Sequence, residues 1–221
     1  MHTKEEIRDV YRKRAGNYDF TVQLYHLLGF RMGFYRERAI ESLHLKAGDT
    51  VVDIACGTGA NFSLLQEKIG PNGRIVGVDF TDAVLTKAEE RIAKNQWRNV
   101  ELVRSDVATY QFPHKVDGVI STFAIIYVPE FDEVIRNGSN SLSAQGRFVV
   151  LDFKVPSGWI SRLTPFLLFV ARPWGLSMEL ASRHPWESIG KHLKHMRLTE
   201  LYGGFVFLAV GEREENFFGV S

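Results

Sequence analysis

Cysteine is almost absent from this sequence of 221 residues, because Cys56 is the only one. A lone cysteine excludes an intramolecular disulfide framework and fits a reducing compartment. Neither sign of charge is in excess, since 27 lysines and arginines face 26 aspartates and glutamates. A balanced chain lacks the broad positive field of a dedicated nucleic-acid binder. We therefore expect a cytoplasmic protein that binds no nucleic acid.

Long apolar runs are also missing. No stretch reaches the roughly 18 to 20 uninterrupted apolar residues of a membrane span, and the leading segment MHTKEEIRDVYRKRAGNYDF is too charged for a secretory signal peptide. No change in composition marks a linker, and the length suits a single domain with its own core.

Between Thr50 and Phe153 short β-branched runs alternate with longer amphipathic segments. This alternation is typical of an α/β fold in which helices flank a mostly parallel sheet. The expected strands are Thr50–Ala55, Arg74–Asp79, Val100–Ser105, Val116–Thr122 and Arg147–Phe153. The expected helices, from apolar residues spaced three and four apart, are Ala60–Ile69, Asp82–Lys94 and Glu130–Leu142.

Segments on either side of this core complete the expected domain. Glu5–Gly16 and Val22–Ser42 are predicted to be helical and to lie across the carboxyl edge of the sheet, and Gly203-Gly204 is predicted to join two strands of a hairpin. The expected division of the single domain is a cap over residues 1–45, a core over 46–155, a lid over 156–197 and a hairpin over 198–221.

The stretch VVDIACGTGANFSLL carries the first sign of a ligand. After a buried strand, Gly57 and Gly59 let the backbone turn tightly and approach a ligand without a Cβ in the way. The start of the following helix directs free N–H groups toward that ligand. Many strand-to-helix turns carry such a pair of glycines without binding anything, so the turn alone does not establish a site.

Acidic residues at three successive strands strengthen the prediction. Asp79 ends the second strand, where a carboxylate can accept both ribose hydroxyls of an adenosine. Asp106 follows the third strand and could accept from an adenine amino group, while Asp53 lies inside the first strand beside the glycine turn. Each acid alone could be a helix cap or a solvated loop end, but three in this arrangement indicate a nucleoside ligand.

A dinucleotide is the first rival ligand. Its fingerprint requires a third glycine for close helix packing, and Phe62 occupies that position here. An acid-rich edge also suits a pyrophosphate poorly. The pattern favours an adenosine that carries a zwitterionic amino acid, which is S-adenosylmethionine.

The successive motifs DIACGTGAN, IVGVDFTDAVLTKAEER, VELVRSDVATYQFP and GRFVVLDFK resemble those of class I S-adenosylmethionine-dependent methyltransferases. Within that superfamily, YRKRAGNYDF and LYGGFVFLAVGE are similar to the ubiquinone/menaquinone C-methyltransferases. The resemblance implies a Rossmann-like seven-stranded sheet with an antiparallel last strand, and S-adenosylhomocysteine as product. Where that family carries an asparagine-containing signature after the fourth strand, this chain has STFAIIYVPEF.

The resemblance also implies a set of cofactor-binding residues. Asp53 and the Ala55–Gly59 turn would hold the methionine part, and residues after the second and third strands would hold the adenosine. Thr122 and Phe123 would line the path to the acceptor, and two tyrosines from the amino-terminal helices would cover the cofactor. The full expected set is Tyr11, Tyr18, Asp53, Ala55, Cys56, Gly57, Thr58, Gly59, Asn61, Asp79, Phe80, Ser105, Asp106, Val107, Thr122 and Phe123.

The methyl acceptor stays open at this stage. A quinol or similar hydrophobic molecule is expected, with a phospholipid or other amine, a thiol and a phenol as alternatives, and a nicotinamide-dependent oxidoreductase or a non-catalytic binding protein as rival functions. Methylation of a ring carbon requires a base that deprotonates a neighbouring phenol. The candidate catalytic residues are His184, Tyr18 and Tyr127, with His114 a weaker one, and no histidine spacing suggests a metal site.

Trp159–Leu176 bears most directly on the substrate. Its apolar core LTPFLLFVA is interrupted by proline and flanked by Arg162 and Arg172, an arrangement suited to a peripheral membrane contact. The same segment could instead be an apolar helix over the sheet or a dimer contact, so both a monomer and a homodimer are compatible with the sequence.

Overall fold

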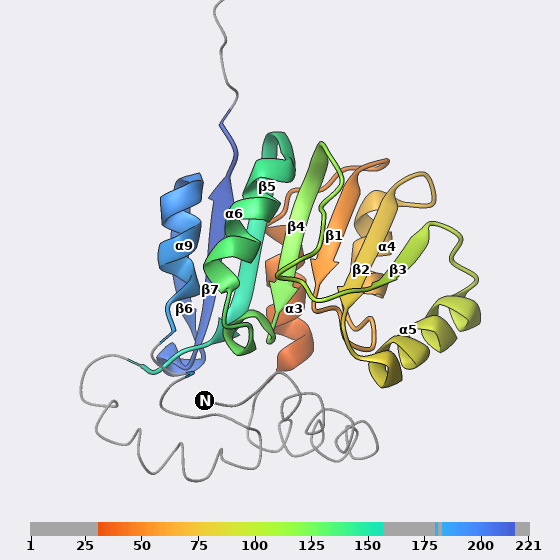
Figure 1. Cartoon of the computed structure of the whole chain (residues 1–221), viewed down its shortest axis with the longest axis horizontal. Helices are drawn as coiled ribbons and strands as arrows, with labels where there is room; N and C mark the ends of the chain where they lie inside the picture. The colour runs from red at the N-terminus through yellow and green to blue at the C-terminus, as the bar shows by residue number, and fades with distance from the viewer. Residues whose placement is uncertain (1–30, 157–179, 181–182, 215–221) are drawn as a thin grey trace, which may run out of the picture.

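The computed structural model describes residues 31–156, 180 and 183–214, which form one sheet with helices packed on both faces (Figure 1). Tyr11, Tyr18, the first predicted helix and Trp159–Leu176 lie outside the described residues. Within the described part, the predicted α/β class is confirmed.

The sheet has seven strands in the order β3-β2-β1-β4-β5-β7-β6. The first five are parallel to one another, and β7 runs antiparallel to both β5 and β6. The strands are β1 Thr50–Ile54, β2 Arg74–Asp79, β3 Val100–Arg104, β4 Val116–Thr122, β5 Leu142–Phe153, β6 Lys194–Leu201 and β7 Val206–Glu212. The predicted antiparallel last strand is therefore confirmed.

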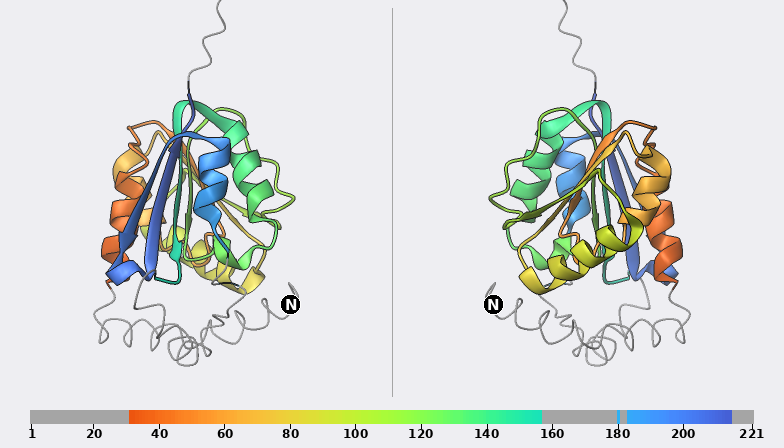
Figure 2. Two further views of the ribbon diagram at one scale, coloured as in Figure 1. Left: turned by 90° about the vertical axis from the view of Figure 1, so that its left-hand side faces the viewer. Right: turned by 90° about the vertical axis from the view of Figure 1, so that its right-hand side faces the viewer.

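Five helices of the described chain cover this sheet: α3 Met32–Glu41, α4 Phe62–Ile69, α5 Asp82–Asn95, α6 Phe131–Ser141 and α9 Pro185–His192. Figure 2 shows α3 and α4 on one face and α6 and α9 on the other. Apolar side chains of α3, α4 and α5 fill one core layer, and those of α6 and α9 fill the second. The sheet separates the two layers, because successive side chains of a strand point to opposite faces. Val51 belongs to one layer and Val52 to the other.

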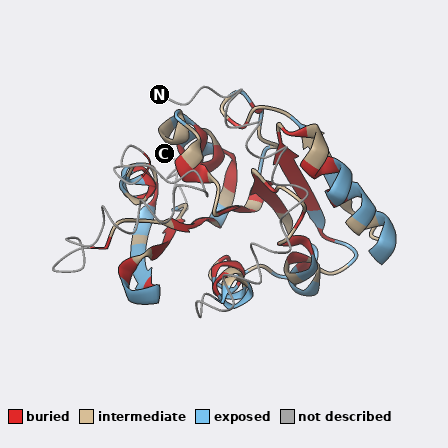
Figure 3. Ribbon diagram, turned by 90° about the horizontal axis from the view of Figure 1, so that it is seen from below, coloured by how far each residue is buried: buried red, intermediate tan, exposed pale blue. Residues whose placement is uncertain are grey.

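The strand order reverses between β1 and β4. The chain moves outward from β1 through β2 to β3, then returns to place β4 on the other side of β1. In open α/β sheets, ligands bind beyond the carboxyl ends of the strands at such a switch point. Figure 3 looks onto this edge, and the strands that meet there are buried.

Two predicted segments differ from the structure by more than one or two residues at an end. β5 begins at Leu142, because that residue already pairs with Val116 before a register irregularity. The described part of Val22–Ser42 is α3, which packs on a face of the sheet through Tyr35, Ala39 and Ile40 and does not lie across the edge.

The last part of the predicted lid is α9, which packs on the sheet, and the start of β6, which is a strand of it. α9 buries Ile189 against the layer that contains Phe207, and β6 starts at Lys194 to pair with β7. The first strand of the predicted hairpin is therefore longer than the sequence suggested, and the 3₁₀ turn Tyr202–Gly204 joins it to β7. Among the described helices, none has the length and apolar character to cross a membrane.

Candidate cofactor site

The glycine turn after β1 is held in a left-handed backbone conformation at three positions. The φ angles of Ala55, Gly57 and Gly59 are 52°, 56° and 70°. A Cβ on Gly59 would lie 2.5 Å from the ring of Phe62, so close packing requires glycine there. A Cβ on Gly57 would meet no atom of the described residues within 4 Å. Gly57 thus borders open space, which leaves room for a ligand against the backbone.

Asp79 ties the end of β2 to this turn. One carboxylate oxygen accepts the N–H of Gly57 at 3.0 Å, and the other accepts the N–H of Thr81 at 2.9 Å. The residue is 6% exposed, and burial raises its pKa against the lowering effect of these hydrogen bonds. The Thr81 side chain and the Phe80 N–H also lower this pKa through hydrogen bonds, so the Asp79 carboxylate is held firmly at the switch-point edge of the sheet.

A polar network lies at the ends of β1 and β4. The Asn61 amide nitrogen donates to the two oxygens of Asp53 at 3.0 and 3.1 Å and to Thr122 Oγ1 at 3.1 Å. From the other side, Arg36 Nη1 donates to Asn61 Oδ1 at 2.8 Å and to Thr122 Oγ1. Asp53 has no exposed surface, and burial raises its pKa to about 7 against the lowering effect of the Asn61 hydrogen bond.

The residues after β3 extend the site toward the outer strands. The N–H of Ser105 donates to the Asp79 carbonyl at 3.0 Å, which places the start of this loop beside the end of β2. Asp106 accepts the N–H of Ala108 at 3.0 Å, and Val107 is buried. Asp106 therefore stabilises the backbone of its own loop, in line with the alternative that this acid caps a local turn. Its neighbour Ser105 joins the loop to Asp79 at the same edge.

Phe123 follows β4 with a φ of 56°, which is rare for an aromatic residue. Its N–H donates to the Leu151 carbonyl at 2.7 Å, and its ring lies 5.0 Å from that of Phe153. Asp152 fixes the next residues, because its carboxylate accepts the N–H of Ile126 at 3.2 Å. A strained backbone stabilised by its surroundings is a frequent feature of functional sites.

The candidate bases fall in different environments. His184 is half exposed just before α9, where its Nδ1 is 3.0 Å from Glu187 Oε1 and its ring stacks on Trp186 at 4.6 Å. The neighbouring Arg183 donates to the Ile126 carbonyl at 2.7 Å, so His184 is held near the loop after β4. Tyr127 lies in that loop and is half-buried, whereas His114 is exposed.

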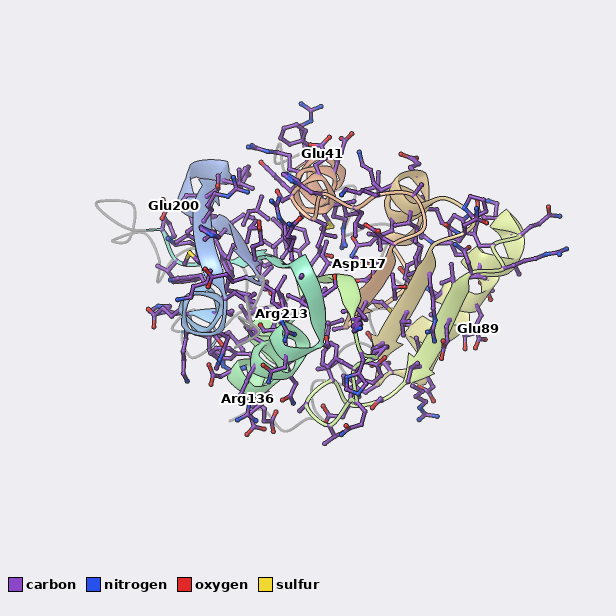
Figure 4. The ribbon with its side chains drawn as sticks, turned by 90° about the horizontal axis from the view of Figure 1, so that it is seen from above. Glu41, Glu89, Asp117, Arg136, Glu200 and Arg213 are labelled. Atoms are coloured by element: carbon purple, nitrogen blue, oxygen red, sulfur yellow. The ribbon has the colours of Figure 1, made fainter. Side chains whose placement is uncertain are left out.

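The opposite edge of the sheet is occupied by structural contacts (Figure 4). Asp117 accepts the N–H of Thr50 at 2.9 Å and the hydroxyl of Ser143 at 2.9 Å. Arg213 donates to carbonyls at the end of α6, including that of Leu142 at 2.8 Å. The described residues contain no cluster of His, Cys, Asp and Glu that could hold a metal ion.

Two residues of this edge, Arg36 and Asp152, were absent from the expected set. Arg36 belongs to a helix whose arginines look alike in the sequence, and its partners are 25 and 86 residues away. Asp152 lies within an apolar run near the end of a predicted strand. A buried acid at that position is the signal that could have pointed to a strand-end function.

Residues 45–172 match the methyltransferase-domain family. The demethylmenaquinone methyltransferase of Listeria monocytogenes serotype 4a is 26% identical over 178 residues, covering 78% of this chain and 74% of that protein. Two crystal structures share the fold. A SAM-dependent methyltransferase from Aquifex aeolicus has a TM-score of 0.56 and 17% identity, with 80% of this chain and 88% of that one covered. A geranyl diphosphate C-methyltransferase from Streptomyces coelicolor has a TM-score of 0.61 and 15% identity, with 80% and 77% covered.

The chain therefore belongs to the methyltransferase-domain family. It is an S-adenosylmethionine-dependent methyltransferase of class I, as the motifs predicted. The space that the described residues leave beside Gly57, and the carboxylate of Asp79 at the same edge, fit this cofactor.

Proposed function

We propose that this methyltransferase transfers a methyl group to a ring carbon of a hydrophobic quinol-like acceptor. When bound, S-adenosylmethionine supplies an electrophilic methyl group on a sulfonium. The observation that carries the proposal is the aromatic pair Phe123 and Phe153, whose centroids are 5.0 Å apart at the ends of β4 and β5. The names of the curated relatives agree with this acceptor class.

We assign the cofactor positions from the geometry of the edge. In this assignment Asp79 accepts the ribose hydroxyls, and Phe80, Ser105, Asp106 and Val107 surround the adenine. The glycine turn and the polar network of Asp53 and Asn61 border the methionine part, and Thr122 leads toward the acceptor. Tyr11 and Tyr18 remain proposed covers of the cofactor from outside the described residues.

Ring methylation also requires an electron-rich acceptor, so a base must remove the proton of a neighbouring phenol. His184 is our first choice, because the contact between its Nδ1 and Glu187 Oε1 at 3.0 Å orients the ring. Tyr127 and Tyr18 are the alternatives. Positioning of the acceptor against the methyl group supplies much of the remaining acceleration, since the reaction is an in-line displacement.

We also propose a substrate lid that is shorter than the sequence predicted. Because α9 and β6 belong to the sheet and its cover, the lid is assigned to residues 156–184. Its apolar core and flanking arginines suit a hydrophobic acceptor or a peripheral contact with anionic lipid. Vesicle co-sedimentation at low and high salt tests the membrane contact, and loss of binding in a Phe166→Ser/Phe169→Ser variant is the expected result.

The experiment that tests the function is an acceptor screen with methyl-labelled cofactor. Quinols, phospholipid amines, thiols and phenols are offered in parallel, and label is expected on a ring carbon of the quinols. Label on nitrogen, sulfur or oxygen of another class would overturn the proposed acceptor while leaving the methyltransferase assignment intact. Calorimetry with S-adenosylhomocysteine and NADH is the control for cofactor class, and only the former is expected to bind.

A further inference from the structure

His184 lies directly before α9, and its side chain is not used by that helix. Pro185 follows it and keeps its backbone out of the α-helical region. The His184 carbonyl accepts the N–H of Glu187 at 2.9 Å, whereas its side chain caps no N–H of the first turn. The direction of the imidazole is therefore set by contacts between side chains.

Two side chains from the first turn of α9 hold this imidazole. Its Nδ1 lies 3.0 Å from Glu187 Oε1, and its ring is stacked on the indole of Trp186, with centroids 4.6 Å apart and planes inclined by 28°. Among the described residues, none makes a hydrogen bond to Nε2. A neutral imidazole whose Nδ1–H donates to a carboxylate keeps its lone pair on Nε2, so Nε2 is the nitrogen that can take a proton.

Trp186 is itself fixed by two further contacts. Its indole meets the ring of Phe207 edge to face at 4.8 Å, and Phe207 has no exposed surface. Lys154 Nζ lies 5.4 Å from the centroid of the same indole and forms an ion pair with Glu200. Because the Glu200 carboxylate balances the ammonium charge, Lys154 anchors the indole without adding a net positive charge near His184.

These contacts bring His184 to the carboxyl edge of the sheet. Lys154 is the residue after β5, and Phe207 lies in β7 opposite the end of β5. The aromatic pair Phe123 and Phe153, which we assign to the acceptor, is at the ends of β4 and β5. The proposed base and the proposed acceptor site therefore share one edge.

We propose that Trp186 is a positioning residue for proton transfer: its indole, anchored by Lys154 and Phe207, holds the imidazole of His184 so that Nε2 takes the proton of the acceptor phenol. This inference rests on the proposed function, in which His184 is the base. The indole face also attracts the imidazolium that results, as does the carboxylate of Glu187.

The protons balance over the whole reaction. The O–H bond of the phenol breaks, its electron pair stays on the oxygen, and an N–H bond forms at Nε2 of His184. A bond then forms between the ring carbon and the methyl group, while the bond from sulfur to methyl breaks and its electron pair stays on sulfur. The ring carbon afterwards releases its own proton to solvent, and the oxygen regains one from His184.

The test is a double-mutant cycle in the full chain, with steady-state kinetics toward a naphthoquinol that carries a short prenyl chain. Trp186→Leu removes the stacking surface and is expected to lower kcat by about ten- to a hundredfold. The KM of the quinol and the affinity for S-adenosylhomocysteine should stay unchanged. Trp186→Phe keeps an aromatic face and should retain most of the turnover. In a His184→Asn background, Trp186→Leu should cause no further loss, because the ring that Trp186 positions is gone.

Trp97→Leu is the matched control. Trp97 is also a partly buried tryptophan packed against a core layer, but it lies a few residues before β3, at the amino end of that strand. The control is expected to lower stability in urea and to keep the wild-type kcat. If Trp186→Leu does not fold, Trp186→Met takes its place in the cycle, because methionine fills more of the same volume.

Three results would overturn the inference. Losses of kcat that add in the double variant would give Trp186 a structural role, and a raised KM with wild-type kcat would make it a wall of the acceptor pocket. Wild-type kinetics in Trp186→Leu would remove its role altogether. Failure of the proposed function gives a different result. Wild-type kcat in His184→Asn rejects the base, and a wild type that does not methylate the quinol rejects the acceptor class, and this inference is rejected with either.

Discussion

The carboxylate of Asp79 accepts the backbone N–H of Gly57 at 3.0 Å, so the end of β2 holds the turn that follows β1. The two residues are 22 positions apart in the chain and lie on adjacent parallel strands or their extensions. One side chain therefore has two roles: it shapes the glycine turn, and it faces the ribose in the proposed site.

Replacing Asp79 by Ala should reduce both cofactor affinity and stability. Each hydrogen bond to a charged group contributes about 1.5–3 kcal/mol, so affinity for S-adenosylhomocysteine should fall by roughly one to two decades or more. Calorimetry and thermal unfolding measure the two effects. Asp117→Ala is the control, because Asp117 also accepts a backbone N–H but lies at the opposite edge. Asp79→Ala with wild-type affinity would rule out the ribose assignment.

The two glycines of the turn should respond differently to alanine. Gly57→Ala adds a methyl group into open space at a φ of 56°, so stability should fall by only about 1–2 kcal/mol while cofactor affinity falls at least tenfold. Gly59→Ala drives a Cβ against Phe62, so overpacking of about 1–3 kcal/mol adds to the backbone strain. Urea unfolding and calorimetry of both variants check this order. Normal binding by Gly57→Ala would mean that the ligand lies elsewhere.

The free energy of unfolding should fall as the pH rises, because of the buried carboxyl group of Asp152. Burial raises its pKa to about 7, whereas the unfolded carboxyl keeps its ordinary value near 3.8. Between these values the native state holds a proton that the unfolded state has released, so unfolding becomes easier with each step up in pH. This loss of unfolding free energy is absent below about pH 4 and complete above about pH 7. It amounts to roughly 4 kcal/mol, because one pKa unit corresponds to about 1.36 kcal/mol.

Asp152→Asn removes this titration while an amide oxygen can still accept the N–H of Ile126. Because the second oxygen of Asp152 accepts the N–H of Phe153 at 2.8 Å, which an amide nitrogen cannot do, the variant should lose some stability at pH 5. Its unfolding free energy should fall less between pH 5 and pH 8 than that of the wild type. Urea titrations at both pH values measure the difference. The buried Asp53 has the same direction of shift, so some pH dependence should persist in the variant. An unchanged slope in Asp152→Asn would show that its carboxyl titrates normally.

His184→Asn should lower turnover without changing cofactor affinity. If His184 deprotonates the acceptor, loss of general-base catalysis should reduce kcat by about 10²–10⁴-fold. His114→Asn is the matched control, because His114 is exposed in the loop before β4. Steady-state kinetics with the acceptor found in the screen and calorimetry with S-adenosylhomocysteine separate the two effects. Wild-type turnover in His184→Asn would show that His184 is not the general base, and Tyr127 or Tyr18 would then be the candidates.

Local sequence patterns were enough to predict the central strands and the glycine turn. Apolar periodicity predicted β2 and β4 to the residue and β1 to within one, because a parallel strand buried on both faces has a continuous apolar pattern. The edge strand β3 was also predicted to within one residue. The turn could be predicted for a related reason. Gly57 and Gly59 occupy backbone conformations that other residues adopt only with strain, so the requirement is visible in the residue type.

The side chains that meet at the carboxyl edge could not be predicted from local patterns, because packing between distant elements brings them together. Nothing local distinguishes Arg36 from Arg38, yet packing of Tyr35, Ala39 and Ile40 against the sheet directs Arg36 toward Asn61 and Thr122. Pairing of β6 with β7 likewise made the end of the predicted lid part of the sheet. Both outcomes depend on contacts between residues far apart in sequence. Local periodicity carries no information about such contacts, since it records which face of an element is apolar and not what covers it.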